Sequence, residues 1–546
     1  MRDDAREITS EIIVVGAGFG GLRAMHELRG RGFSVRGLEA GSGVGGTWYW
    51  NAYPGARTDT EAWGYNYFFD KALTTGWSWS QRNPPQPEVR AHLEYVADKL
   101  DLKKNFEFNS FVKSAHYDEA ANQWVLTVGD DSIYRCTYLV NACGPLSSPM
   151  TPAIKGLETF RGRWMHTGRW PKDAVDLAGK RIAVIGTGST GVQVVPAVAP
   201  IARQLTIFQR TPNYVLPGRN YPFIESERDA IRAGFEQIKA QVRHHAFGFP
   251  MGMSDKMFDD LTPAERQRIM EAKWEVGGFQ FIFETFADLI SNRECNATAA
   301  EFIRNKIRAT VKDPVTAEKL CPKYPFFLKR PPLGQRYYEA FNRDNVRLHD
   351  LFEAPIDEIV PEGIRAGGQV YPFDIIIFAI GFDAGTGAFT DIDIVGRHGR
   401  SLREGWRDGP RTHFGICVDE FPNMFMISGP QGPLTNFPPV IDAQAEWLGQ
   451  LLDRARSLAS DTVEVMPDAV ARWTTIVNSS SSGTILEDAA SVGSWYAGAN
   501  VEGKAKVMQF YVGGTNIYFN ILEESAADDF PGMAFNRIGA KDLARN

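Results

Sequence analysis

Several features that mark common classes of protein are missing from this chain. No uncharged apolar stretch approaches the roughly 18 residues that a membrane-spanning helix needs, and the polar first ten residues do not resemble a signal peptide. Positive charge is not in excess, because 59 Lys and Arg stand against 66 Asp and Glu, a net charge of −7. We therefore expect no integral membrane segment, no nucleic-acid partner and a cytoplasmic location.

Cysteine is scarce, with five in 546 residues. The five are Cys136, Cys143, Cys295, Cys321 and Cys417. No two of them form a CxxC or CxxxxC pair, and none has the spacing of metal ligands. This pattern is typical of reduced thiols in a cytosolic protein, and it predicts no metal site.

The chain does contain one glycine pattern in two copies, about 170 residues apart. Each copy follows a short apolar run, residues 12–15 and residues 182–185, that is typical of a buried strand. The pattern places a tight turn and a helix N-terminus after the strand, where backbone N–H groups can bind a diphosphate. The residues predicted to form the two turns are Gly16, Gly18 and Gly21, and Gly186, Gly188, Ser189 and Gly191. Two such units predict an α/β protein with two Rossmann-like dinucleotide-binding domains.

The two copies differ at the end of the strand that follows each of them. Glu39 lies 18 residues after the last glycine of the first copy, where a carboxylate can accept hydrogen bonds from a ribose diol. At the same spacing the second copy has Gln209, followed by Arg210. A guanidinium can bind a 2′-phosphate that a carboxylate would repel. We therefore predict FAD at the first site and NADP(H) at the second; the alternative is that Arg210 is only a solvated surface residue.

The patterning also divides the chain. The predicted division is 1–144 with 384–546 for a split FAD-binding domain, 145–224 with 325–383 for the NADP-binding domain, and 225–324 for a helical insertion subdomain. In the insertion, charged and apolar residues recur at intervals of three and four, which favours helices. Thr262 before Pro263, with Glu265 three residues on, predicts a capped helix start there.

Between the two nucleotide sites lies a segment with the pattern FxGxxxHxxxWP. The matching residues are Phe160, Gly162, His166, Trp170 and Pro171. The segment resembles the fingerprint of the Baeyer–Villiger monooxygenases, flavoproteins that use FAD and NADPH to convert ketones into esters or lactones. The resemblance covers nearly the whole chain and includes the segments 45–48, 53–57, 208–213, 329–330 and 494–500. The family usually has Asp after the WP pair and Thr in its ATGF segment, where this chain has Lys172 and Ile380.

The resemblance implies a catalytic pair. In the family, reduced flavin and O2 form a C4a-peroxide, and this anion attacks the ketone carbonyl while a permanent cation lies beside it. That cation is the arginine of a Lys-Arg pair, which corresponds to Arg330 with Lys329 before it. Asp59 corresponds to the acid paired with the arginine, and a buried arginine needs such a counter-charge. Without the resemblance, Arg330 could equally be a surface base and Asp59 a turn residue.

Further roles follow from the same resemblance. Lys329 and Thr211 would join Arg210 at the 2′-phosphate, and Trp495 would fold over the bound nicotinamide cofactor. The residues expected at the flavin are Gly46, Thr47 and Trp48, and those expected at the substrate pocket are Leu434, Thr435, Asn436 and Phe437. His166 lies in what the sequence indicates is the interdomain linker, and we expect it to act as a hinge or packing residue rather than as a base.

Three other functions remain open from the sequence. An S- or N-oxidising flavin monooxygenase would share both dinucleotide sites, but that group usually has an aromatic–basic pair in place of Trp170-Pro171. A disulfide reductase would need a cysteine pair near the flavin, and a redox sensor would bind both nucleotides without turnover. The expected partners are a small-molecule ketone and O2, while the identity of the ketone, the selectivity and the oligomeric state are not fixed by the sequence.

Overall fold

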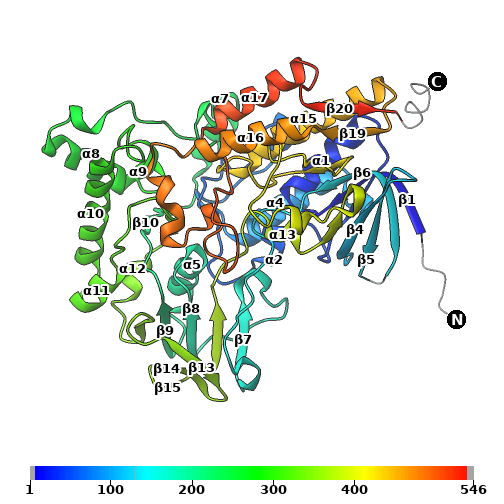
Figure 1. Ribbon diagram of the computed structural model, residues 1–546. Coiled ribbons are helices and arrows are strands. Elements are labelled where there is room, and N and C mark those ends of the chain that lie inside the picture. The colour runs from blue at the N-terminus through cyan, green and yellow to red at the C-terminus, as the bar shows by residue number, and fades with distance from the viewer. Residues whose placement is uncertain (1–6, 130, 538–546) are drawn as a thin grey trace, which may run out of the picture.

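The computed structural model describes residues 7–129 and 131–537 (Figure 1). Two separate sheets form its framework, each built around one glycine motif. The larger sheet has the order β17-β4-β5-β6-β1-β2-β3, with β18 also paired to β6. Its strands are β1 (Glu7–Val15), β2 (Val35–Leu38), β3 (Phe106–Glu107), β4 (Val112–Asp118), β5 (Gln123–Val128), β6 (Ile133–Asn141), β17 (Asp393–Val395) and β18 (Met424–Met426).

The first glycine motif lies at the centre of this sheet. β1 pairs in parallel with β2 on one side and β6 on the other, and α1 (Phe19–Gly30) follows it after the glycine turn. Residues 12–15 of β1 are all buried, because a central parallel strand is covered on both faces. The turn therefore lies at the edge where the carboxyl ends of β1 and β6 meet.

The second sheet has the order β12-β9-β8-β16-β7, and all its strand pairs are parallel. Its strands are β7 (Arg163–His166), β8 (Arg181–Ile185), β9 (Gln204–Gln209), β12 (Val346–Asp350) and β16 (Ile375–Phe378). The second glycine turn connects β8 to α5 (Ser189–Val198). The predicted α/β architecture with two Rossmann-like units is thus confirmed.

The structure corrects the placement of the fingerprint segment. Residues 163–166 form the edge strand β7 of the second sheet, with His166 opposite Phe378 of β16, so His166 does not lie in a linker. The partner strand begins roughly 210 residues later in the chain. Because β7 has two exposed and two buried residues, neither its periodicity nor its neighbours indicated a strand.

The predicted helical insertion lies between β10 (Leu216–Pro217) and β11 (Leu333–Gly334), and it is drawn mostly in green in Figure 1. Its helices are α6 (Glu225–Ala233), α7 (Phe235–His244), α8 (Pro263–Val276), α9 (Gln280–Phe283), α10 (Arg293–Thr310) and α11 (Pro314–Leu320). The capping box at the start of α8 is present. The Thr262 N–H donates to the Glu265 carboxylate at 2.8 Å, and the Glu265 N–H donates to the Thr262 hydroxyl at 3.4 Å.

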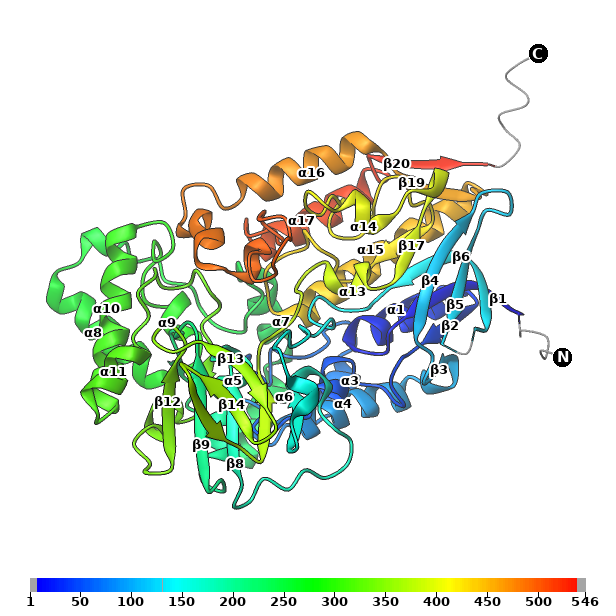
Figure 2. The same ribbon diagram turned by 60° about the horizontal axis from the view of Figure 1, so that its bottom comes forward.

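After β16 the chain returns to the first sheet. β17 pairs with β4 and β18 with β6, while α15 (Phe437–Ser457) packs against α1 and α17 (Thr515–Ala527). Figure 2 shows α16 (Pro467–Ser479), β19 (Thr462–Val465) and β20 (Met533–Asn536) on the same side of the molecule. A small antiparallel sheet of β13 (Ile356–Val360), β14 (Gly363–Ala366) and β15 (Gln369–Pro372) precedes β16 and was not predicted from the sequence.

The five cysteines are all free thiols. Within the described ranges, no helix combines the length and the apolar character needed to cross a membrane. The same residues contain no cluster of three His, Cys, Asp or Glu side chains that could hold a metal ion.

Candidate active site

The first glycine turn depends on contacts that only glycine allows. Gly16 has a φ of +105°, and a Cβ there would lie 2.6 Å from the carbonyl oxygen of Ala142. A Cβ on Gly21 would lie 1.8 Å from the carbonyl oxygen of Gly16, and one on Gly46 would lie 2.8 Å from Gly18 Cα. No side chain caps the N-terminus of α1. Its first N–H groups therefore remain available to a diphosphate.

Glu39 follows β2 beside this turn and is only 4% exposed. One carboxylate oxygen accepts a hydrogen bond from the Ala17 N–H at 2.7 Å, and the other accepts one from the Gly41 N–H at 2.6 Å. Burial raises the pKa of Glu39, while these two bonds act in the opposite direction. Each oxygen of a carboxylate can accept two hydrogen bonds, so this geometry fits a ribose diol as a further donor.

The second glycine turn repeats the first, with one difference. A Cβ on Gly186, whose φ is +114°, would lie 2.3 Å from the carbonyl oxygen of Ala379, and one on Gly191 would lie 2.1 Å from that of Gly186. By contrast, a Cβ on Gly188 would meet no atom within 4 Å. Since α5 also begins, at Ser189, without a side-chain cap, the turn leaves room for a diphosphate to approach the backbone.

Two cations lie together near the end of β9. Burial and, to a lesser degree, the charge of Arg210 lower the pKa of Lys329 to about 8. The Lys329 ammonium donates to the carbonyl oxygen of Gly493 at 3.3 Å, and the carbonyl oxygen of Thr211 accepts from the Thr187 hydroxyl at 2.8 Å. Neither cation forms an ion pair with any carboxylate of the described residues. Neighbouring cations without a counter-charge are suited to bind a phosphate.

Arg330 and Asp59 form an ion pair although 271 positions separate them. Nη2 donates to Oδ1 at 2.9 Å, and Nη1 donates to Oδ2. The side chains are 28% and 21% exposed, and the Arg330 Cζ lies 5.1 Å from the ring centroid of Phe279. Burial lowers the pKa of Arg330, but Asp59 outweighs it and the net shift is upward. The structure thus brings together the two residues predicted as the catalytic pair.

A contact that sequence reasoning missed holds the segment before Asp59. Gln193 of α5 accepts a hydrogen bond from the Tyr53 hydroxyl at 2.9 Å and donates one to the carbonyl oxygen of Arg57 at 3.1 Å. Gly55 lies against the same helix, where a Cβ would be 2.3 Å from the Gln193 carbonyl oxygen. The helix of the second glycine motif therefore also positions the acid of the ion pair. No local signal distinguishes this glutamine from any other polar helix residue.

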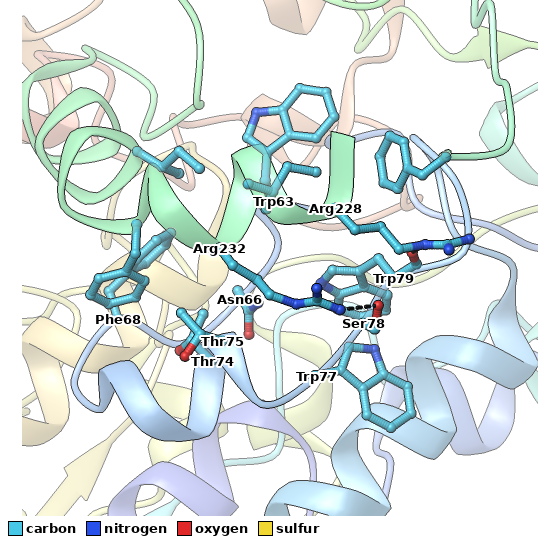
Figure 3. A pocket seen from close by; sticks show the side chains of 14 residues that line it. Trp63, Asn66, Phe68, Thr74, Thr75, Trp77, Ser78, Trp79, Arg228 and Arg232 are labelled. Atoms are coloured by element: carbon cyan, nitrogen blue, oxygen red, sulfur yellow. Dashed lines mark hydrogen bonds between the residues drawn. The ribbon is translucent and has the colours of Figure 1, made fainter. Parts of the chain in front are cut away.

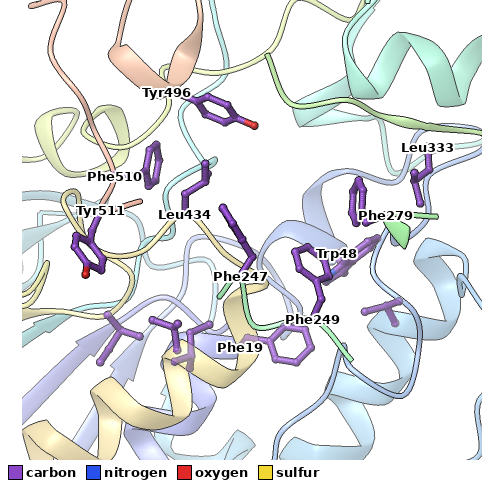
Figure 4. Packing of buried hydrophobic residues seen from close by; sticks show 14 of the residues in the cluster. Phe19, Trp48, Phe247, Phe249, Phe279, Leu333, Leu434, Tyr496, Phe510 and Tyr511 are labelled. Atoms are coloured by element: carbon purple, nitrogen blue, oxygen red, sulfur yellow. The ribbon is translucent and has the colours of Figure 1, made fainter. Parts of the chain in front are cut away.

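Phe279, which lies against Arg330, belongs to a cluster of buried apolar side chains (Figure 4). We call this cluster the aromatic wall; it consists of Phe247, Phe249, Phe279, Leu434, Tyr496 and Phe510. The ring centroids of Phe249 and Phe279 are 5.1 Å apart. Phe327, three residues before Arg330, lies 6.2 Å from Phe247 and 6.4 Å from Tyr496. The wall combines the helical insertion with two segments near the end of the chain.

The residues predicted to line the substrate pocket divide into two groups. Leu434 is 8% exposed and belongs to the wall. The Thr435 hydroxyl instead donates to the carbonyl oxygen of Phe247 at 3.0 Å, and the Asn436 amide donates to that of Gly248 at 3.0 Å. These two side chains hold residues 247 and 248 against the segment that precedes α15.

The remaining predicted residues occupy helix starts. Phe437 is the first residue of α15, and Thr47 begins the short α2 (Thr47–Trp50). Trp48 is buried. Trp495 is half-buried in the 3-10 helix η7 (Trp495–Ala497), and its ring lies edge-on to Phe510 with centroids 5.3 Å apart.

Comparison with known proteins places this site in a family. A family model described as pyridine nucleotide-disulphide oxidoreductase matches residues 10–236. The chain is 41% identical over 534 residues to a Baeyer–Villiger monooxygenase of Pseudooceanicola batsensis, covering 97% of each. It is 39% identical over 526 residues to the phenazine N-monooxygenase of Lysobacter antibioticus, covering 96% of each. The solved structure of cyclohexanone monooxygenase from Rhodococcus sp. Phi1 with NADP+ matches with a TM-score of 0.95 at 39% identity, over 97% of this chain and 100% of that one.

The chain belongs to the Baeyer–Villiger monooxygenase family. It is an enzyme that uses FAD and NADPH to convert ketones into esters or lactones, as the resemblance implied. The uncapped helix ends and the tight glycine turns described above fit both dinucleotides. The absence of any cysteine pair also separates this monooxygenase from the disulfide reductases that share its nucleotide-binding units.

The first half of the monooxygenase fingerprint packs within the second sheet. Phe160 lies in the apolar cluster beneath β13 and β14, and a Cβ on Gly162 would be 2.4 Å from the carbonyl oxygen of Asp374. His166 is buried, and its Nδ1 accepts from the Gly168 N–H at 3.0 Å. Burial, aided by a neighbouring arginine, lowers the pKa of His166 to about 4. The imidazole is therefore neutral at physiological pH.

The second half of the fingerprint contacts α2 of the first domain. The backbone N–H of Trp170 donates to the carbonyl oxygen of Trp50 at 3.3 Å. Lys172, which replaces the family's usual Asp, donates to the carbonyl oxygen of Tyr49, and its Nζ lies 3.6 Å from the centroid of that ring. Trp170 and Pro171 line an open groove of about 630 Å³ between the two units.

A further pocket, of about 30 Å³, lies between segment 63–79 and helices α6 and α7 (Figure 3). Its wall includes Trp63, Trp77 and Trp79, and Arg232 donates to the Ser78 hydroxyl there at 2.9 Å. The pocket has room for one or two water molecules. Neither it nor the groove includes the Arg330–Asp59 pair.

Proposed function

We propose that Arg330, held by Asp59, is the catalytic cation of this monooxygenase. The observation that supports this role is the bidentate ion pair between Arg330 and Asp59, which lies against Phe279 of the aromatic wall. A guanidinium is charged at every working pH, and its carboxylate partner offsets the cost of burying it. In this position it would stabilise negative charge that develops on oxygen during attack on a carbonyl.

The cofactors, when bound, supply hydride transfer and the activation of dioxygen. We assign FAD to the turn of Gly16, Gly18 and Gly21, with Glu39 on a ribose and Gly46, Thr47 and Trp48 at the flavin. We assign NADP(H) to the turn of Gly186, Gly188, Ser189 and Gly191, with Arg210, Thr211 and Lys329 on the 2′-phosphate and Trp495 over the nicotinamide. The open backbone at Gly188 and the unpaired cations support this assignment.

The proposed substrate is a compact, apolar ketone, with O2 as co-substrate. Apolar rings of the aromatic wall favour a hydrocarbon frame through burial alone, and the similar cyclohexanone monooxygenase is named for a cyclic ketone. Leu434 is the proposed contact from its segment, whereas Thr435, Asn436 and Phe437 shape the wall from behind.

N-oxidation of an aromatic heterocycle is the second candidate, because a phenazine N-monooxygenase is nearly as similar to this chain as the Baeyer–Villiger enzyme is. The two activities are separated by incubating the purified enzyme with NADPH, O2 and either cyclohexanone or phenazine. If cyclohexanone gains one oxygen atom and phenazine does not, the result supports ketone oxidation.

The decisive variant is Arg330→Ala, with Arg343→Ala as a control that removes an exposed arginine from the same part of the chain. We expect Arg330→Ala to retain bound flavin and to lose ester formation, while Arg343→Ala keeps both. An Arg330→Ala enzyme that still forms the ester would refute the assignment.

The remaining assignments concern the architecture. We propose the domain division 1–144 with 384–546, 145–224 with 325–383, and 225–324, with hinges at 145–152 and after residue 382. His166 would keep a packing role at the end of β7. A cytoplasmic location remains our proposal, and the five free thiols are consistent with it.

A further inference from the structure

Tyr496 is fixed in position beside the ion pair but has no assigned task. It lies in η7 directly after Trp495, and its ring centroid is 4.7 Å from that of Trp495. Its carbonyl oxygen accepts from the Gln509 N–H at 2.8 Å. These contacts hold both the backbone and the ring, so the hydroxyl has a defined direction.

The hydroxyl of Tyr496 differs from those of comparable tyrosines. Four described tyrosines are at most 1% exposed. Tyr67, Tyr214 and Tyr518 each donate to a backbone carbonyl oxygen, at 2.8, 2.6 and 2.6 Å. The Tyr496 hydroxyl donates to no described residue, although a buried tyrosine hydroxyl usually has a partner. The Tyr496 ring is buried, but its hydroxyl is not among the fully enclosed polar atoms that lack a partner. The hydroxyl therefore opens onto space in which an acceptor atom of a ligand can reach it.

The surroundings of this hydroxyl are those of the reaction centre. Figure 4 shows it at the rim of the aromatic wall, directed away from Phe510 and toward the side of Phe279. The charges of Arg330 and Asp59 both act on it. Burial raises the pKa of Tyr496 well above its ordinary value, although Arg330 opposes the shift. The phenol therefore stays protonated at neutral pH and can donate a hydrogen bond.

We propose that the Tyr496 hydroxyl donates a hydrogen bond to the carbonyl oxygen of the ketone substrate. This role rests on the ketone-oxidising function stated above and adds a second, neutral donor next to Arg330. The bond orients the carbonyl against the aromatic wall and strengthens as negative charge builds on that oxygen. No proton is transferred, so the phenol needs no partner base.

The test uses Tyr496→Phe, which removes one oxygen atom and keeps the ring. Tyr511→Phe is the matched control, because Tyr511 lies near the same cluster with its hydroxyl turned away from Phe279 (Figure 4). We expect kcat/KM for cyclohexanone to fall about 10- to 100-fold in Tyr496→Phe only. The KM for NADPH and the flavin content should stay unchanged in both variants.

A binding measurement separates a contact with substrate from a structural effect. Carbonyl-¹³C cyclohexanone is bound to the oxidised enzyme in the presence of NADP+, and its C=O stretch is read by isotope-edited infrared spectroscopy. A hydrogen bond lowers this frequency, so it should rise in Tyr496→Phe and stay constant in Tyr511→Phe. An unchanged frequency in Tyr496→Phe, or a wild-type frequency equal to that in hexane, would overturn the proposal. Wild-type enzyme that forms no lactone would instead count against ketone oxidation itself.

Discussion

Replacing Lys329 by Met should weaken the use of NADPH and spare that of NADH. Lys329 lies beside Arg210, and within the described chain neither has a carboxylate partner. A charge-assisted hydrogen bond to a phosphate contributes about 1.5–3 kcal/mol. Since 1.4 kcal/mol corresponds to a factor of ten, kcat/KM for NADPH should fall about 10- to 100-fold. NADH lacks the 2′-phosphate, so its value should change less than about threefold.

The pKa of Lys329 gives the same prediction a pH dependence in the unmodified enzyme. With a pKa of about 8, about nine-tenths of the ammonium is charged at pH 7 and about one-tenth at pH 9. Because the charged form binds the phosphate, kcat/KM for NADPH should bend downward above pH 8, by up to about tenfold at pH 9. The profile for NADH should lack this bend.

The assay is steady-state NADPH and NADH oxidation at saturating ketone, from pH 6.5 to 9.5, for wild type, Lys329→Met and Lys323→Met. Lys323 is an exposed lysine six residues earlier, so its loss controls for a general change in charge. The bend should vanish in Lys329→Met and persist in Lys323→Met. Equal losses with both nucleotides, or a bend that survives in Lys329→Met, would remove Lys329 from the phosphate site.

Three further predictions concern cofactor binding and stability. Gly191→Ala should raise the KM for NADPH more than about tenfold while FAD content is retained, because the new Cβ would lie 2.1 Å from a carbonyl oxygen of the turn; a normal KM would show that the turn can yield. Arg82→Met should lower the free energy of unfolding by about 3 kcal/mol, measured by urea denaturation, because Glu61, 1% exposed, would lose the cation 3.0 Å away; an unchanged midpoint would contradict this. Acid should unfold the enzyme between pH 6.5 and 4, because burial lowers the pKa of four histidines to about 4 or below. Their stabilising effect is present above pH 6.5 and is lost as pH falls through about 4, at about 1.4 kcal/mol per pH unit for each. The four are His92, with a pKa of about 3, and His166, His245 and His413, each with one of about 4. Stability that stays constant over this range would refute the linkage.

The sequence predicted those parts of the fold whose causes are local. A buried strand, three glycines and a helix follow one another within about ten residues at each nucleotide turn, and the contacts at Gly21 and Gly191 explain why no other residue fits there. The capping box at Thr262 is equally local. In both cases the stabilising partner lies a few positions away, so the pattern is complete in the sequence.

Structural features that depend on residues far away in the chain were missed or wrongly placed by the sequence analysis. β7 became a strand only because β16 supplies its hydrogen bonds. The contacts of Gln193 with the segment before Asp59 join residues about 140 positions apart in the chain. Arg330 and Asp59 were found through the resemblance to a family, since nothing local links them. Tyr496 stands next to the predicted Trp495, yet its free hydroxyl becomes visible only when the other buried tyrosines can be compared in space.

The attachment of the helical insertion has a consequence for redesign. The side chains of Thr435 and Asn436 donate hydrogen bonds to the main-chain carbonyl oxygens of residues 247 and 248 and not to side chains. The side chain at position 247 is thus free to vary while the anchorage stays the same. Gly248 has to be kept, because its φ is +65° and a Cβ there would lie 2.8 Å from the Thr435 hydroxyl oxygen. Replacing residues 245–283 by those of a relative would change which ketones the enzyme accepts. The two dinucleotide-binding sheets, and with them hydride transfer, would stay the same.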